Sequence, residues 1–188
     1  MIGRNYEYAD SVCVDVKKCV YLAVHEMIQT GHKKICYINI PQAIRSHKER
    51  LEGAEKAIAE SSVCLEKYIL YPQHNTGEGG YQAIKELIES GERPDAIVAA
   101  NDSLALGVMR YLYKQKIRIP DDISLISCED SILSGYAAPA LSTVNIEKEL
   151  IGEEASHILL NRMARPKAKQ VSMLITPRLV KRDTIQKR

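Results

Sequence analysis

The segment from Pro94 to Cys128 most constrains the fold, because it combines two short apolar runs with one helical repeat. Ala96–Ala100 and Ile123–Cys128 are apolar runs with the length of buried strands. Between them, apolar residues recur at helical spacing, namely Ala105, Val108, Met109 and Leu112. The helix is expected to begin at Asp102 or Ser103, because either side chain can accept hydrogen bonds from the first-turn amides. Two strands buried on both faces and joined by one helix should be parallel.

The rest of the chain repeats this alternation of helical stripes and short apolar runs. Helical stripes run from Lys17 to Gly31, His47 to Ser61, Tyr81 to Gly91 and Lys148 to Met163, and apolar runs cover Ile35–Ile40 and Leu65–Tyr71. Ser142–Ile146, Val171–Ile175 and Arg178–Val180 are expected to be extended. Strict alternation of this kind predicts an α/β fold with a doubly wound parallel sheet.

Length and composition bound the class of protein. At 188 residues the chain can form one large domain or two small lobes with a substantial core. Its hydrophobic content of 45% and charged content of 27% argue against disorder. The net charge of +2 comes from scattered basic residues, which gives no sign of a nucleic-acid or membrane surface. No apolar stretch approaches 18 residues and no signal-peptide pattern follows Met1, so we expect a cytoplasmic protein without membrane contact.

The cysteines and the missing motifs argue against catalysis. Five cysteines, at positions 13, 19, 36, 64 and 128, form no CxxC pair, and several lie inside apolar runs. This pattern predicts free buried thiols in a reducing compartment rather than disulfides or a zinc site. The sequence has no HExxH motif, nucleophile elbow, GxGxxG motif or paired metal-ligand histidines. It therefore predicts a binding domain with no catalytic residues, no metal and no cofactor.

Polar side chains follow each of the four strands that we expect to be parallel. They are Ser46 and Arg50 after the first strand, His74 and Asn75 after the second, Asn101 and Asp102 after the third, and Glu129 and Asp130 after the fourth. The carboxyl ends of parallel strands meet at one edge of a sheet, where ligands of such folds bind. An arginine fork, amides and carboxylates could together hold a polyhydroxylated or amide-bearing small molecule. Each also has a purely structural interpretation, with Asp102 as an N-cap, Arg50 as a surface residue and the last two acids as turn caps.

Several strings of the sequence resemble the effector-binding core of the LacI/GalR family of bacterial transcriptional regulators. The longest, AANDSLALGVMRYLYKQKIRIPDDISLISCED, is similar to the family's AND-x-x-ALG helix and the xPxDISxxG[FY]DD strand that follows it. TGHKKICYI, RLEGAEKAI, GGYQAIKELI, PALSTVNIEKELIGEEA and PRLVKRDT match further family strings in the same order. The resemblance runs from about residue 2 to residue 185. It implies a periplasmic-binding-protein-like fold of type I, with two lobes, three crossovers and an effector cleft.

By this resemblance the chain supplies mostly the second lobe. Residues 1–15 would be a remnant of the amino-proximal lobe, 16–141 the effector-binding lobe, 142–172 a crossover with the helix of the amino-proximal lobe, and 173–188 the return strand and tail of the effector-binding lobe. The family's helix-turn-helix domain and part of the first lobe would be missing, so operator DNA is expected to be bound only through that missing domain. The helix near 148–163 should then pack on a neighbouring chain or be poorly ordered.

The resemblance also implies an effector site. Five positions match the family's effector-binding residues: Arg50, which would hold effector hydroxyls or a carboxylate; Asn101, a cleft asparagine; Glu129, in place of a cleft aspartate; Asn75, in place of a stacking aromatic ring; and Ser46, a polar contact. The family's pattern is broken at Val16, Cys19, Asn39-Ile40 and Ser127-Cys128. These changes are expected to crowd and depolarise the cleft, so the hypothesis leaves two outcomes open, an unusual effector or no effector.

Leu106 and Tyr136 fall where members of the family pack two subunits together, although Leu106 could also be a core residue. The leading hypothesis is therefore the effector-binding and dimerisation core of a LacI-type transcriptional regulator. Its partners would be a sugar or similar small polar metabolite and a second copy of the chain. A solute-binding protein for sugar transport, an enzyme acting on a sugar phosphate and an inactive domain fragment are the alternatives.

Overall fold

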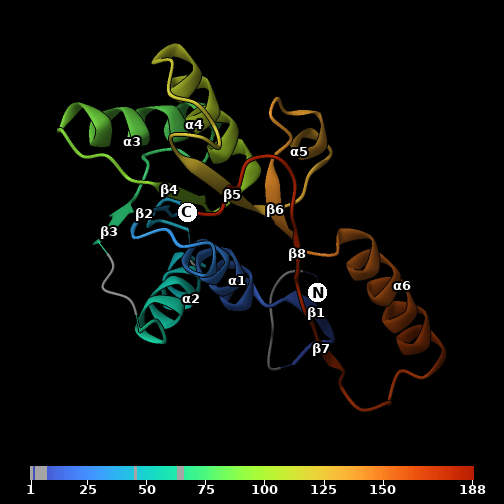
Figure 1. Cartoon of the computed structure of the whole chain (residues 1–188). Coiled ribbons are helices and arrows are strands. Elements are labelled where there is room, and N and C mark those ends of the chain that lie inside the picture. The colour runs from blue at the N-terminus through green and yellow to red at the C-terminus, as the bar shows by residue number, and fades with distance from the viewer. Residues whose placement is uncertain (1, 3–7, 45, 63–65) are drawn as a thin grey trace.

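The computed structural model describes residues 2, 8–44, 46–62 and 66–188 of the chain. They form a six-stranded sheet with strand order β3-β2-β4-β5-β6-β8 and a two-stranded sheet of β1 and β7 (Figure 1). The strands are β1 (Ser11–Val14), β2 (Lys34–Ile38), β3 (Glu66–Leu70), β4 (Ala96–Ala99), β5 (Ser124–Glu129), β6 (Ser142–Asn145), β7 (Ser172–Ile175) and β8 (Arg178–Val180). The helices are α1 (Val16–Gln29), α2 (His47–Ala59), α3 (Gly77–Glu89), α4 (Asp102–Lys114), α5 (Ile132–Tyr136) and α6 (Lys148–Ala164).

Helices cover both faces of the larger sheet. Strands β3, β2, β4, β5 and β6 pair in parallel, and only β8 joins them in the antiparallel direction. Helices α1 and α2 pack together on one side of this sheet, and α3 and α4 pack together on the other (Figure 1). This arrangement confirms the doubly wound α/β fold predicted from the alternation of strands and helices. Parallel strands need such crossover helices, which also bury both faces of the sheet.

The core lies between the larger sheet and its helices. All four residues of β4 are fully buried, as the continuous apolar run predicts. The buried His32 is part of this packing: its Nε2 lies 2.9 Å from the Ser124 hydroxyl, and its Nδ1 lies 3.1 Å from the Met27 carbonyl. Burial lowers the pKa of the His32 imidazole, since the core disfavours the charged ring. The turn after α1 is therefore joined to β5 through a neutral histidine.

The strand, helix and strand predicted between Pro94 and Cys128 are present as β4, α4 and β5, but the predicted N-cap is wrong. The side chain of Asn101, not that of Asp102 or Ser103, accepts the hydrogen bond from the Leu104 amide at 3.0 Å. Asp102 is buried, and three donors from β5, the following turn and α5 satisfy its carboxylate. They are Ser127 Oγ, Ser131 N and Ser134 Oγ. Asn101 therefore caps the helix, whereas Asp102 accepts hydrogen bonds from distant segments. A local sequence pattern does not predict such tertiary contacts.

The pairing of two short strands also differs from the predicted boundaries. These boundaries group Ser142–Asn145 with the crossover and Met173–Ile175 with the larger lobe. In the structure β6 lies between β5 and β8 in the larger sheet, and β7 pairs with β1 in the smaller one. The first three residues of β6 are buried, as an interior strand requires, whereas β7 has two exposed residues out of four. The division of the whole chain into lobes remains a prediction.

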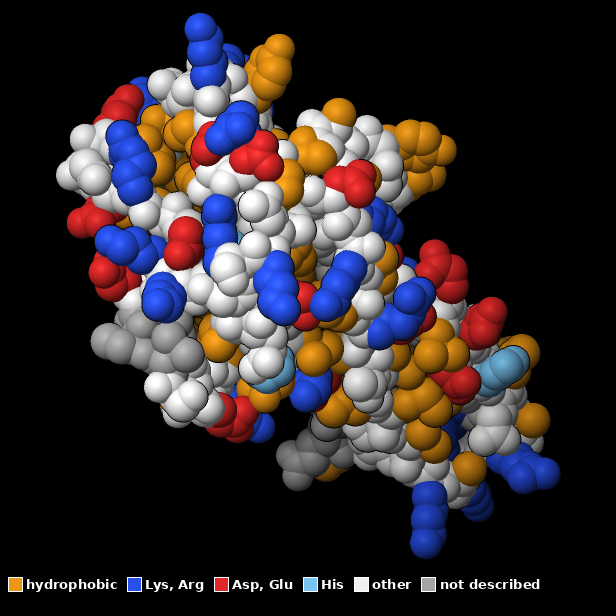
Figure 2. Space-filling view, in the orientation of Figure 1, with side chains coloured by type: hydrophobic (Ala, Val, Ile, Leu, Met, Phe, Trp, Pro, Cys, Tyr) orange, Lys and Arg blue, Asp and Glu red, His pale blue; other side chains and the backbone are white. Residues whose placement is uncertain are grey.

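Helix α6 lies beside the smaller sheet. It contacts β1, and its Arg162 guanidinium donates to both oxygens of Asp10 at 2.8 Å. None of its residues is buried, and Leu159, Leu160 and Met163 are 60–70% exposed. Hydrophobic side chains are accordingly visible in the α6 region at the lower right of Figure 2. Its packing on a neighbouring chain remains a prediction. Within the described part of the chain, no helix is long and apolar enough to cross a membrane.

Candidate functional site

The carboxyl ends of β2, β4, β5 and β6 form one edge of the larger sheet. Their parallel register brings Ala99 beside Ser127 and Glu129 beside Asn145. The loops that leave this edge begin with Asn39, Ala100, Asp130 and Ile146. Because the amide and carbonyl groups at strand ends leave the ladder here, side chains from the loops and following helices complete the hydrogen bonding. The predicted effector-binding residues belong to these loops, to the end of β5, to the start of α2 and to the loop after β3.

Arg50 reaches from α2 to the end of β4. Its Nη1 donates a hydrogen bond to the Ala100 carbonyl oxygen at 2.9 Å. Its Nε atom is buried and has no hydrogen-bond partner among the described residues. Leaving a buried polar donor without an acceptor lowers stability by about 1–3 kcal/mol, and a charged guanidinium donor costs more. The first predicted site residue therefore lies at the predicted edge and retains an unused donor.

The predicted residues Asn101 and Asn75 bind each other. Asn101 Nδ2 donates to Asn75 Oδ1 at 2.6 Å, while Asn101 Oδ1 caps α4. The structure thus brings the loops after β3 and β4 together through two amides. Because Asn101 is held from both ends of its side chain, it is a fixed donor and acceptor rather than a free rotor. The side chain of Asn75 is a positioning contact for it.

Glu129, the last residue of β5, is paired with a lysine from the crossover. Lys148 Nζ lies 3.4 Å from Glu129 Oε1, and the two side chains are 39% and 35% exposed. Lys148 is the first residue of α6, so this ion pair connects the larger sheet to the helix beside the smaller one. Sequence reasoning missed Lys148. Its position at the predicted start of a helix gave no signal that it would reach back to β5.

Ser46 occupies the N-cap position of α2, but its side chain makes no capping hydrogen bond. It lies one turn before Arg50, whose amide donates to the Ser46 carbonyl at 3.1 Å. The half-buried hydroxyl is therefore available at the same edge. Asn39, predicted only as a departure from the family's pattern, holds this loop in place. Its side chain accepts from Tyr37 Oη and the Ile40 amide and donates to the His47 carbonyl.

Two thiols lie next to this edge. Cys19 and Cys128 are buried, and Cys128 Sγ is 3.9 Å from the Cys19 carbonyl oxygen. The neighbouring Cys19 side chain and burial together raise the pKa of the Cys128 thiol, so it is an unreactive neutral group. Cys13, Cys19, Cys36 and Cys128 are all free in the described residues, and Cys64 lies outside them. Among the residues described, no group of three or more histidine, cysteine or acidic side chains could hold a metal ion.

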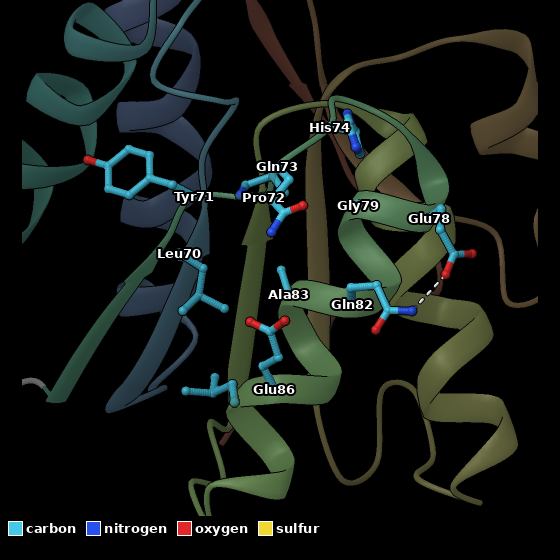
Figure 3. A pocket seen from close by; sticks show the side chains of 11 residues that line it. Leu70, Tyr71, Pro72, Gln73, His74, Glu78, Gly79, Gln82, Ala83 and Glu86 are labelled. Atoms are coloured by element: carbon cyan, nitrogen blue, oxygen red, sulfur yellow. Dashed lines mark hydrogen bonds between the residues drawn. The ribbon is translucent and has the colours of Figure 1, made fainter.

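A cavity of about 310 Å³ lies between β3 and α3, beside the loop that carries Asn75 (Figure 3). It is lined by Leu70, Tyr71, Pro72, Gln73, His74, Glu78, Gly79, Gln82, Ala83, Glu86 and Leu87. Gln82 donates to Glu78 Oε1, one turn earlier in α3, at 2.8 Å. His74, predicted together with Asn75, lines this cavity. The other predicted residues Arg50, Asn101 and Glu129 do not line it.

The two predicted interface residues differ in exposure. Leu106 in α4 is half-buried, whereas Tyr136 in α5 is 82% exposed. Ile132 and Leu133, in the same short helix, are 77% and 55% exposed. A second cavity, of about 630 Å³, separates the end of α4 from the loop after α5 and includes Tyr113. Hydrophobic side chains project from the α5 region at the upper right of Figure 2.

These features define the class of the domain. A doubly wound sheet with polar residues converging on the carboxyl ends of its strands is the arrangement of a small-molecule binding domain. Residues 24–185 match the family model described as a periplasmic binding protein-like domain, and the chain belongs to this family.

Within that class, the chain is an effector-binding domain of the LacI type, as the sequence strings predict. It is 33% identical over 167 residues to the HTH-type transcriptional repressor PurR of Mannheimia succiniciproducens, covering 89% of this chain and 50% of the repressor. It is 31% identical over 167 residues to the ribose operon repressor of Haemophilus influenzae, covering 88% and 50%. The chain therefore spans about half the length of these curated relatives, which are transcriptional repressors rather than enzymes.

A solved structure shows the same fold. The complex of the transcriptional regulator CelR with cellobiose superimposes with a TM-score of 0.85 at 27% identity. The match covers 97% of this chain and 56% of that one.

Proposed function

We propose that this chain is the effector-binding core of a transcriptional regulator, and that it binds a sugar or similar small polar metabolite at the carboxyl edge of the larger sheet. The observation that carries the proposal is the side chain of Arg50. It crosses from α2 to the end of β4 and keeps a buried Nε donor without a partner. An effector oxygen would satisfy that donor, and Asn101 and Glu129 would supply further polar contacts nearby.

The relatives support the metabolite class. One is named for the ribose operon, and the CelR regulator is found in complex with cellobiose. Because the curated relatives are repressors, a regulator is favoured over a solute-binding protein or an enzyme. DNA binding would reside in a domain outside this chain, and the location would be the cytoplasm, where operator DNA lies.

A homodimer belongs to the same proposal. Tyr136, Ile132 and Leu133 expose large apolar side chains on one short helix. Exposed apolar residues gathered in one place mark an interaction surface. A second copy of the chain would bury them together with Leu106.

The proposal is tested by isothermal titration calorimetry with a panel of pentoses, hexoses, disaccharides and nucleobases. Arg50→Ala should weaken binding of any ligand that the chain accepts by about tenfold or more, since it removes a charged hydrogen-bond donor. Arg165→Ala is the matched control, because Arg165 is exposed at the end of α6, distant in the chain from this edge. Equal affinity in the presence and absence of Arg50 would disprove the site assignment.

A further inference from the structure

We infer that the effector carries an acidic group, a carboxylate or a phosphate, and that Lys148 is a residue that determines this specificity by neutralising Glu129. The inference rests on the proposed function, because it concerns the ligand of the same strand-end site. It is carried by the unpaired donor of Arg50 and by the ion pairs and hydrogen bonds that already engage the acidic residues of the same edge.

Arg50 has no acidic partner in the described part of the chain. Its Nη1 donates one hydrogen bond to a neutral carbonyl oxygen, and its Nε donor is buried and unpaired. A guanidinium in this state is best satisfied by a planar or multidentate anion, because charge-assisted bonds are roughly twice as strong as neutral ones. Carboxylates and phosphates match the fork of arginine donors in geometry as well as charge.

The carboxylate at the end of β5, the strand next to β4, is already engaged. Glu129 pairs with Lys148, whose ammonium nitrogen is 3.4 Å from Oε1. Both side chains are more than one-third exposed, so the pair is screened and contributes little to folding stability. Its effect on a ligand is different, because the lysine cancels the charge that would otherwise repel an incoming anion.

The other acidic residues of this edge are also committed. Asp102 accepts hydrogen bonds from Ser127, Ser131 and Ser134, and these occupy both of its oxygens inside the core. Asp130 pairs with Arg182 at 2.8 Å. Both carboxylates are therefore already paired within the chain. The buried nitrogen donor without a partner at this edge, Arg50 Nε, belongs to a cation, which favours an anionic ligand over a neutral sugar.

The test compares metabolites that differ only in an acidic group. Ribose is paired with ribose 5-phosphate, and glucose is paired with both glucose 6-phosphate and gluconate, so that phosphate and carboxylate are distinguished. Calorimetry on the unmodified chain should give tighter binding of at least one acidic member than of its neutral partner, by about tenfold. That preference should decrease as the salt concentration rises, because salt screens the partly exposed charges.

Lys148→Gln should reduce the ratio of acidic to neutral affinity by about five- to tenfold, since it removes one partly screened charge. Glu129→Gln should leave that ratio unchanged or raise it. Lys167→Gln, an exposed lysine after α6, is the control and should change neither affinity. Circular dichroism on each variant shows whether the fold is retained.

Two results overturn the inference and can be told apart. If neutral sugars bind as tightly as their acidic partners, with binding still dependent on Arg50, the proposed function stands and the acidic effector is refuted. An unchanged affinity ratio in Lys148→Gln refutes the role of the lysine. If no member of any pair binds, the proposed function itself fails, and the inference fails with it.

Discussion

The close packing of α3 on α4 predicts that alanine in place of Gly107 lowers the stability of the fold. A methyl group added to Gly107 would lie 1.8 Å from the carbonyl oxygen of Gly77, so the two helices would have to separate by more than one ångström. Overpacking against backbone that does not yield costs about 3 kcal/mol, at the upper end of its usual range. Alanine in place of glycine returns about 1 kcal/mol of helix propensity. Gly107→Ala should therefore lower the free energy of unfolding by about 2 kcal/mol.

The matched control is Gly152→Ala in α6. A methyl group there meets no atom within 4 Å, so only the propensity gain of about 1 kcal/mol remains. For a chain of 188 residues each kcal/mol shifts the melting temperature by about 2–4 °C. Thermal unfolding followed by circular dichroism should thus show a fall of about 4–8 °C for Gly107→Ala and no fall for Gly152→Ala. If Gly107→Ala melts at or above the unmodified chain, the close approach of the two helices is not as described.

Three further predictions concern hydrogen bonds and charge. Burial lowers the pKa of His32, so the folded state binds fewer protons than the unfolded state; stability should fall as pH drops below about 6.5, and His32→Gln should flatten that dependence in urea titrations. Thr184→Val should cost about 1–3 kcal/mol in urea unfolding, because the buried hydroxyl joins two backbone groups of the larger sheet, whereas Thr184→Ser should cost less. The Arg162 guanidinium lowers the pKa of Asp10 to about 2, so its contribution is present above pH 4 and lost as pH falls towards 2; Asp10→Asn should remove this acid-dependent part of the melting curve.

The larger sheet was predictable because its strands are long enough and buried enough to leave a pattern. The four residues of β4 are apolar and fully buried, and α4 follows them with a clear 3.6-residue repeat. The helix near 148–163 was also predicted correctly as a helix. Its Leu150, Leu159 and Leu160 are spread around the axis, and none of its residues is buried. Periodicity finds a helix without locating the surface that it packs against.

The candidate site was predictable only in part. The rule that ligands bind at the carboxyl ends of parallel strands placed Arg50, Asn101 and Glu129 at one edge together with five other polar residues. The resemblance to the LacI/GalR family then selected these three as site residues. The contacts that determine what these residues can do came from segments distant in the chain. Lys148 lies 19 positions from Glu129, and Asn75 lies 26 positions from Asn101. Such long-range polar pairs follow from the packing of loops, for which a single sequence contains no period.

The short crossover between β6 and α6 connects the candidate site to the smaller sheet. Glu147 adopts a left-handed backbone conformation, with φ of 54°, which costs a non-glycine residue about 1–2 kcal/mol. Three contacts offset that cost: its amide donates to Asn145 Oδ1 at 2.6 Å, its carboxylate pairs with Arg178 on β8, and the adjacent Lys148 pairs with Glu129. The ion pair between Lys148 and Glu129 joins the proposed site to this turn. A ligand that draws Lys148 away from Glu129 would therefore remove one of the three contacts that stabilise the turn. The energetics of ligand binding and of the connection to α6 are therefore linked through one side chain.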